Sequence, residues 1–151
     1  MTEKKTILVG GTFDILHVGH LKFLKFAKAQ ATPSQLIVII ARDETVKKTS
    51  HHTPIFSENE RKELVENLKM VDKAILGNLP GKSSFLDILT TVRPDIVVLG
   101  HDQFFNANKI EEWAMNHGLN LKVIRAREFT VEGLASSSAV RKKVREVENE
   151  E

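Results

Sequence analysis

Two histidines three residues apart follow a short apolar run near the start of the chain. His17 and His20 come shortly after Gly10 and Gly11, and paired glycines allow the backbone to approach a ligand closely. If both histidines are helical, their side chains share one face and can point at the same anion. The start of a helix also favours an anion, because unpaired amides and the helix dipole point toward it. The segment is therefore typical of a phosphate site between a strand and a helix.

Other interpretations of these residues stay open on spacing alone. A Gly-Gly pair after a strand is often only a tight turn, and two histidines can lie together on a surface by accident or bind a metal. Zinc would need further ligands, but the chain has no cysteine and its remaining histidines show no matching spacing. They are His51, His52, His101 and His117. Metal binding is the weaker interpretation.

More candidate phosphate ligands occur later in the chain. Ser136, Ser137 and Ser138 precede a helical segment and offer hydroxyls and amides at its start. Arg141 follows one turn later, although the basic run from Arg141 to Arg145 also fits a solvated helix face. Lys47 and Lys48 begin a stretch expected to be a loop that could close on phosphates.

Five short runs rich in isoleucine and valine indicate the elements that must position these residues. The expected strands are Thr6–Val9, Leu36–Ala41, Lys73–Leu76, Asp95–Leu99 and Leu121–Arg125. Helical spacing of apolar residues lies between them, and Ser57 to Glu60 forms a capping box. Gly118 fits a left-handed helix end. Continuous apolar strands joined by helices predict a Rossmann-like, doubly wound α/β fold with a five-stranded parallel sheet.

The organisation and composition indicate one domain. We expect the domain to span residues 1–145, followed by a frayed acidic tail at 146–151, with loops near the site at Lys47–Phe56, Gly77–Ser84 and Glu128–Ser137. The net charge of +2 is too small to indicate nucleic acid or a membrane as a partner. No apolar stretch is long enough to span a membrane. With no cysteine present, we expect a cytoplasmic protein.

Two separated motifs carry a family resemblance. The run Gly11-Thr12-Phe13-Asp14 with His17-Val18-Gly19-His20, and the run Ala135 to Arg141, resemble the paired signatures of the cytidylyltransferase-like nucleotidyltransferase superfamily. Nearly the whole chain is similar to the archaeal FAD synthases, through Ala41 to Lys48, Arg61 to Gly77 and Leu99 to Gln103. One departure is Ala135, where the archaeal enzymes often carry a cysteine. Glycerol-3-phosphate cytidylyltransferases share much of the same frame.

The resemblance implies an activity and roles for individual residues. It implies transfer of AMP from ATP to FMN, giving FAD and pyrophosphate; CTP with a small acceptor, or a regulatory module without turnover, are the alternatives. It assigns His17 and His20 to the α- and β-phosphates, where partial protonation would help. The expected catalytic residues are His17, His20, Lys47, Ser137 and Ser138. The residues expected to bind the nucleotide are Gly11, Thr12, Phe13, His17, Val18, Gly19, His20, Arg61, Asp102, Ser136, Ser137, Ser138 and Arg141.

Three expectations concern groups outside this set. Mg²⁺ or another divalent cation should arrive on the nucleotide triphosphate, with Asp14 either touching it indirectly or only bonding the turn. Trp113 should be a core residue rather than a platform for the flavin. Relatives of this kind are often dimers, so a homodimer is expected.

Overall fold

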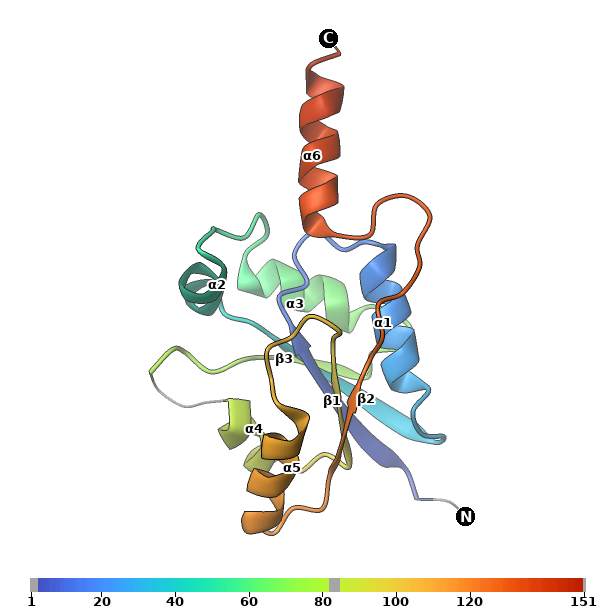
Figure 1. Ribbon diagram of the computed structural model, residues 1–151, viewed down its shortest axis with the longest axis vertical. Helices are drawn as coiled ribbons and strands as arrows, with labels where there is room; N and C mark the ends of the chain where they lie inside the picture. The colour runs from blue at the N-terminus through green and yellow to red at the C-terminus, as the bar shows by residue number, and fades with distance from the viewer. Residues whose placement is uncertain (1–2, 82–84, 151) are drawn as a thin grey trace.

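The computed structural model describes residues 3–81 and 85–150, and within these ranges it contains one sheet of five strands and six helices (Figure 1). All strand pairs are parallel, and the strand order is β3-β2-β1-β4-β5. The strands are β1 (Lys5–Gly11), β2 (Ser34–Ile40), β3 (Lys73–Leu76), β4 (Ile96–Leu99) and β5 (Lys122–Arg125). The predicted Rossmann-like parallel sheet is confirmed, with each strand within two residues of its expected bounds at either end.

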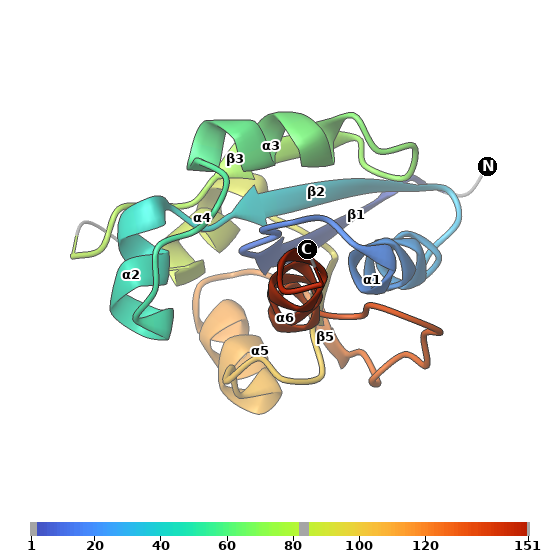
Figure 2. The same cartoon turned by 90° about the horizontal axis from the view of Figure 1, so that it is seen from above.

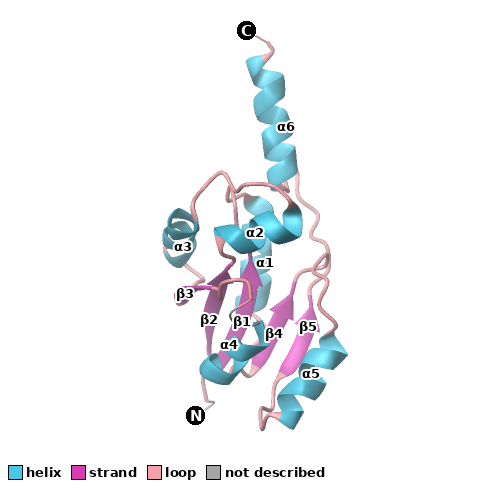
Figure 3. Ribbon diagram, turned by 90° about the vertical axis from the view of Figure 1, so that its left-hand side faces the viewer, coloured by secondary structure: helices cyan, strands magenta, loops and turns pink. Residues whose placement is uncertain are grey.

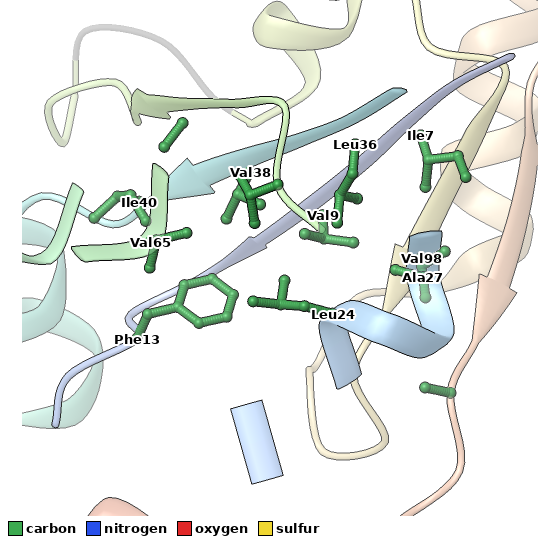
Figure 4. Packing of buried hydrophobic residues seen from close by; sticks show 13 residues of the cluster. Ile7, Val9, Phe13, Leu24, Ala27, Leu36, Val38, Ile40, Val65 and Val98 are labelled. Carbon is green, nitrogen blue, oxygen red and sulfur yellow. The ribbon is translucent and has the colours of Figure 1, made fainter. Parts of the chain in front are cut away.

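Helices cover both faces of the sheet (Figure 3). They are α1 (Val18–Lys28), α2 (Asp43–Ser50), α3 (Glu58–Glu66), α4 (Phe85–Val92), α5 (Ala107–Asn116) and α6 (Ser137–Glu148). Alternate strand residues point to opposite faces: Ile7 and Val9 pack with α1 and α3 in one apolar cluster, whereas Leu8 packs with α4 and α5 in the other. Figure 4 shows the first cluster, in which the ring of Phe13 lies beside Leu24 and Val65.

The predicted helix boundaries are largely confirmed. The Ser57 hydroxyl accepts a hydrogen bond from the Glu60 amide at 3.2 Å and caps α3. Gly118 has a φ of +73° just after α5, as a left-handed helix end requires. No helix in the described ranges is long and apolar enough to cross a membrane.

Two expectations about irregular segments are wrong. Residues 43–50 form α2, so the first part of the expected Lys47–Phe56 loop is helical. The helix α6 continues to Glu148, so part of the expected frayed tail at 146–151 is ordered helix. Both helices bury almost nothing, one residue in α2 and none in α6, which is why apolar periodicity gave little sign of α2. The segment Glu128 to Ser136 is irregular as expected, and residues 82–84 of the Gly77–Ser84 stretch lie outside the described ranges.

Candidate active site

The site lies where the carboxyl ends of β1 and β4 meet. These strands are neighbours in the sheet, yet the chain reaches β4 only after passing through β2 and β3 on the other side of β1. Such a reversal of strand order opens a crevice at the carboxyl ends of the strands. The start of α6 stands over this edge, as the views from the side and from above show (Figure 2, Figure 3). Three segments far apart in sequence therefore converge there.

The two histidines stack on one another at the start of α1. Their ring centroids are 3.7 Å apart, with 25° between the planes. The backbone amide of His17 donates to Nδ1 of His20 at 3.3 Å. Because Nδ1 of His20 accepts this bond, the proton of the neutral ring belongs on Nε2, which is left as a donor. Nδ1 of His17 is buried and has no hydrogen-bond partner among the described residues.

The electrostatics of the pair differ from the expectation of partial protonation. Burial lowers the pKa of His17. The pKa of His20 falls to about 4, mainly through burial and then through the neighbouring His17, while Asp14 opposes the shift. Both rings are therefore neutral near pH 7 in the protein without substrate. As neutral imidazoles they still each provide one N–H donor.

The loop after β1 is shaped by packing of its aromatic residue. Phe13 has a φ of +53° and is 4% exposed, so its ring joins the core rather than lining an open site as expected. A Cβ on Gly11 would lie 2.8 Å from this ring, which explains the glycine at that position. The ring centroid of Phe13 also lies 5.3 Å from that of His20. Gly11 and Phe13 thus fix the path of the loop and the position of the His20 ring.

Asp14 joins three segments. Its carboxylate accepts hydrogen bonds from the amides of Ile55 and Phe56 at 2.8 and 3.0 Å, and from Arg141 at 3.1 Å. Its carbonyl oxygen accepts from the Ser137 hydroxyl at 2.5 Å. Asp14 is 3% exposed, so its carboxylate is fully engaged within the protein. Of the two roles considered, the structure shows the one that bonds the turn.

The serines lie at the start of α6, next to the histidine segment. The Ser136 hydroxyl accepts from the Ala139 amide at 3.0 Å and caps the helix, while the Ser137 hydroxyl is bonded to Asp14. Ser138 is exposed. The amides of Ser137 and Ser138 precede the first bond within the helix and are free to bind an anion. The groups available to donate to an anion here are therefore the backbone amides rather than the hydroxyls.

Arg61 does not face the site in this structure, contrary to the expected phosphate contact. Its side chain is fully buried. The guanidinium donates to the carbonyls of Phe56 and Thr12 at 3.0 and 2.7 Å and to the Asp43 carboxylate at 2.7 Å. Arg61 therefore fastens α3 to the loop after β1 and to the start of α2, and it acts on the site only through these segments.

Lys47 and Val18 lie at the surface. Lys47 is exposed on α2 rather than in a loop. Val18 begins α1 with 48% of its surface exposed. Gly19 follows it, and a Cβ there would lie 2.8 Å from the carbonyl oxygen of Ala135. The start of α1 thus packs directly against the segment that leads into α6.

The loop after β4 is held in place by two side chains that the sequence did not single out for this role. Gln103 donates to the Gly10 carbonyl at 3.0 Å and accepts from the Gly100 amide at 2.8 Å. Arg125, at the end of β5, donates to the carbonyls of Gly100 at 2.9 Å and Gln103 at 2.8 Å, and also to that of Phe105. The sequence feature that could have drawn attention to Arg125 was a charged residue at the end of a strand. Asp102 is exposed on this pinned loop, at the edge of the crevice.

Trp113 lies away from these segments. It packs against the second apolar cluster, with the His117 ring stacked on it at 4.0 Å. Its position supports the core interpretation.

Comparisons with known proteins agree with this arrangement. The sequence matches the cytidylyltransferase-like family over residues 8–143. A curated FAD synthase from Thermococcus kodakarensis is 42% identical over 123 residues, which cover 82% of this chain and 80% of that protein. The crystal structure of a lipopolysaccharide core biosynthesis protein from Thermoplasma volcanium is 35% identical, with a TM-score of 0.76, covering 83% of this chain and 98% of that one.

A protein of unknown function from Archaeoglobus fulgidus shares the fold, with 16% identity, a TM-score of 0.61, and coverage of 85% of this chain and 94% of its own. The family match includes both motif segments that the structure brings together, from the β1 loop to the start of α6. The chain belongs to the cytidylyltransferase-like family.

Proposed function

We propose that the protein is an FMN adenylyltransferase, which transfers AMP from ATP to FMN and releases pyrophosphate. One observation carries the nucleotidyl-transfer part of this proposal. Asp14 fastens the start of α6 to the loop that leads into the histidine pair, so two helix starts converge on one place. Each helix start favours negative charge. The 42% identity to an FAD synthase supports ATP and FMN as the substrates.

The reaction is an in-line displacement. A phosphate oxygen of FMN attacks the α-phosphorus of ATP, a new P–O bond forms, and the bond from the α-phosphorus to the bridging oxygen breaks as pyrophosphate leaves. No protein nucleophile is needed, so the protein contributes alignment of two anions and stabilisation of the charge that grows on the phosphate oxygens. The converging helix starts are suited to both tasks.

The histidines act as hydrogen-bond donors in this scheme. With Nδ1 of His20 occupied by the His17 amide, the Nε2 proton can be donated to a phosphate oxygen. A bound triphosphate would also raise the pKa of both rings, because a nearby negative charge favours the imidazolium form. The rings would then gain charge as the nucleotide binds, and their donation would strengthen.

Cationic side chains complete the proposed phosphate site. Arg141 is 25% exposed and paired with Asp14, so it can turn one guanidinium edge to a phosphate while keeping its place at the first turn of α6. Lys47 is exposed on α2 and makes no ion pair within the described ranges. It is free to approach the phosphates of either substrate. We assign Asp102 to the ribose or base of ATP.

The divalent cation is proposed to arrive with the nucleotide, as MgATP. Among the described residues, no group of three or more histidine and acidic side chains could hold a metal ion, and the Asp14 carboxylate is already occupied by two amides and Arg141. Mg²⁺ readily binds through substrate phosphates while keeping several waters. The donor set therefore suits a cation supplied by the substrate.

The acceptor can be tested by thermal unfolding. FMN together with a non-hydrolysable ATP analogue and Mg²⁺ should raise Tm, since ligands at about 100 times their Kd stabilise by roughly 2.7 kcal/mol. For a chain of this size that is a shift of several degrees. Glycerol 3-phosphate with a CTP analogue is the matched control and should give little or no shift. No response to FMN, with a clear response to the control pair, would overturn FMN as the acceptor and leave nucleotidyl transfer standing.

A further inference from the structure

Arg125, the last residue of β5, is bound to the loop that follows β4 and not to an acidic partner. We call residues 100–106 the β4 loop. The guanidinium donates to the carbonyl of Gly100 at 2.9 Å, to that of Gln103 at 2.8 Å, and also to that of Phe105. Within the described ranges Arg125 makes no ion pair. Its side chain is therefore given over to holding the backbone of one loop.

Burial contributes little to the order of the β4 loop. The side chain of Phe104 is fully exposed. Phe105 is 42% exposed, and its ring meets that of Phe85 at the start of α4, with 5.2 Å between the centroids. Fixing the backbone of a loop costs conformational entropy, which contacts in the folded protein must offset. Here the polar bonds from Arg125 supply much of that compensation.

Gln103 attaches the same loop on its other side. Its side-chain amide donates to the carbonyl of Gly10, near the end of β1, at 3.0 Å, and accepts from the amide of Gly100 at 2.8 Å. β4 lies between β1 and β5 in the sheet (Figure 3), so Gln103 and Arg125 hold the loop from opposite sides. Asp102 directly precedes Gln103 and is exposed. The two attachments thus fix the backbone that carries Asp102.

We propose that Arg125 is a positioning residue for the nucleotide: it holds the β4 loop in the conformation in which Asp102 meets the ribose or base of ATP. The inference rests on the proposed function, which assigns Asp102 to the nucleotide. A loop that is already ordered in the free protein does not have to be ordered by the ligand, and such preorganisation raises affinity. The planar guanidinium suits this task because it presents several donors in fixed directions, whereas a lysine ammonium is a point charge on a flexible stem.

Equilibrium binding of a non-hydrolysable ATP analogue with Mg²⁺ tests this role without using the acceptor. Arg125→Met should raise the Kd about 10-fold, the equivalent of ordering roughly one more loop residue on binding. The KM for ATP should rise by a similar factor while kcat stays within about two-fold of the wild type. Arg125→Lys keeps the charge but not the planar donor group, and it should weaken binding nearly as much. Lys122→Met is the matched control, because it removes a positive charge from the other end of β5, and its Kd should be unchanged.

A double-mutant cycle with Asp102→Ala separates positioning from a general effect on the fold. Because Arg125 acts through Asp102, Arg125→Met should raise the Kd by less than about 3-fold when Asp102 is already alanine. An undiminished rise in that background, an unchanged Kd in Arg125→Met alone, or full affinity in Arg125→Lys would overturn the inference. A wild type that does not bind the analogue would overturn the proposed function and the positioning role together. Normal binding without formation of FAD would overturn only the acceptor.

Discussion

Gly19→Ala sets two opposite effects against each other and so tests how the site is assembled. Gly19 lies in the first turn of α1, where exchanging glycine for alanine ordinarily stabilises a helix by about 1 kcal/mol. Here the added Cβ would lie 2.8 Å from the Ala135 carbonyl oxygen and 2.9 Å from Cε1 and Nδ1 of His17. The substitution therefore pushes at once on the His17 ring and on the segment that leads into α6, the two parts of the proposed phosphate site.

The clash should outweigh the gain in helix propensity. Ordinary contacts of a Cβ begin near 3.4 Å, so α1 and the Ala135 segment must move apart by roughly 0.6 Å. Neither neighbour is a flexible side-chain end, because one is backbone and the other is the stacked ring of His17. Overpacking of this kind costs about 1–3 kcal/mol. The net effect should be a loss of up to about 2 kcal/mol in the free energy of unfolding.

Turnover should fall more sharply than stability. A misplacement approaching 1 Å can cost about 100-fold in rate, so we expect Gly19→Ala to lower kcat by about 10- to 100-fold. Urea unfolding and initial rates of FAD formation measure the two effects, with Lys25→Ala on the exposed side of α1 as the control. A Gly19→Ala variant that is about 1 kcal/mol more stable than the wild type, with an unchanged rate, would refute the packing of α1 against the α6 segment.

Four further outcomes are expected. His17→Ala and His20→Ala should each lower turnover by about 100-fold or more, the scale for losing a donor to growing negative charge; a near-normal rate would remove that histidine from the mechanism. Asp102→Ala should raise KM for ATP more than it lowers kcat; an unchanged KM with collapsed kcat would place Asp102 at the reacting phosphate. Arg61→Met should cost about 1–3 kcal/mol in urea unfolding, because it leaves the Phe56 and Thr12 carbonyls without their donor and Asp43 without its partner; a loss below about 0.5 kcal/mol would show that the buried network is not structural. Because the pKa of His20 falls from 6.5 to about 4 on folding, the unfolded chain binds its proton first, so stability should decline as pH drops from 6.5 to about 4. His20→Gln should flatten that decline, and an unchanged pH profile would contradict the buried neutral ring.

The sequence was sufficient for the sheet because its three central strands, β1, β2 and β4, are buried on both faces. Leu36 to Ile40 is a continuous apolar run, and it pairs along its length with β1. α2 lacked such a signal, since Val46 is its one buried residue. A helix held at its N-terminal end, through Arg61 on Asp43 and Glu58 on Arg42, leaves little periodicity to detect.

Within the site, it was easier to predict which residues take part than to predict the directions in which their side chains point. The histidine pair and the serine segment do converge, as the motifs suggested. Spacing along the chain could not show that the Phe13 ring turns into the core or that Arg61 points inward. Both depend on contacts with residues far away in sequence. Gln103 and Arg125 were missed for the same reason, because each acts by bonding the backbone of another segment.

The most direct test of the central claim is product analysis. The protein would be incubated with Mg²⁺, with ATP or CTP, and with FMN or glycerol 3-phosphate, and the products separated by chromatography. The account predicts FAD and pyrophosphate in equal amounts from ATP and FMN, and little product from the other combinations. Formation of CDP-glycerol from CTP without FAD would contradict the FMN adenylyltransferase assignment, and no product from any pair would contradict nucleotidyl transfer itself.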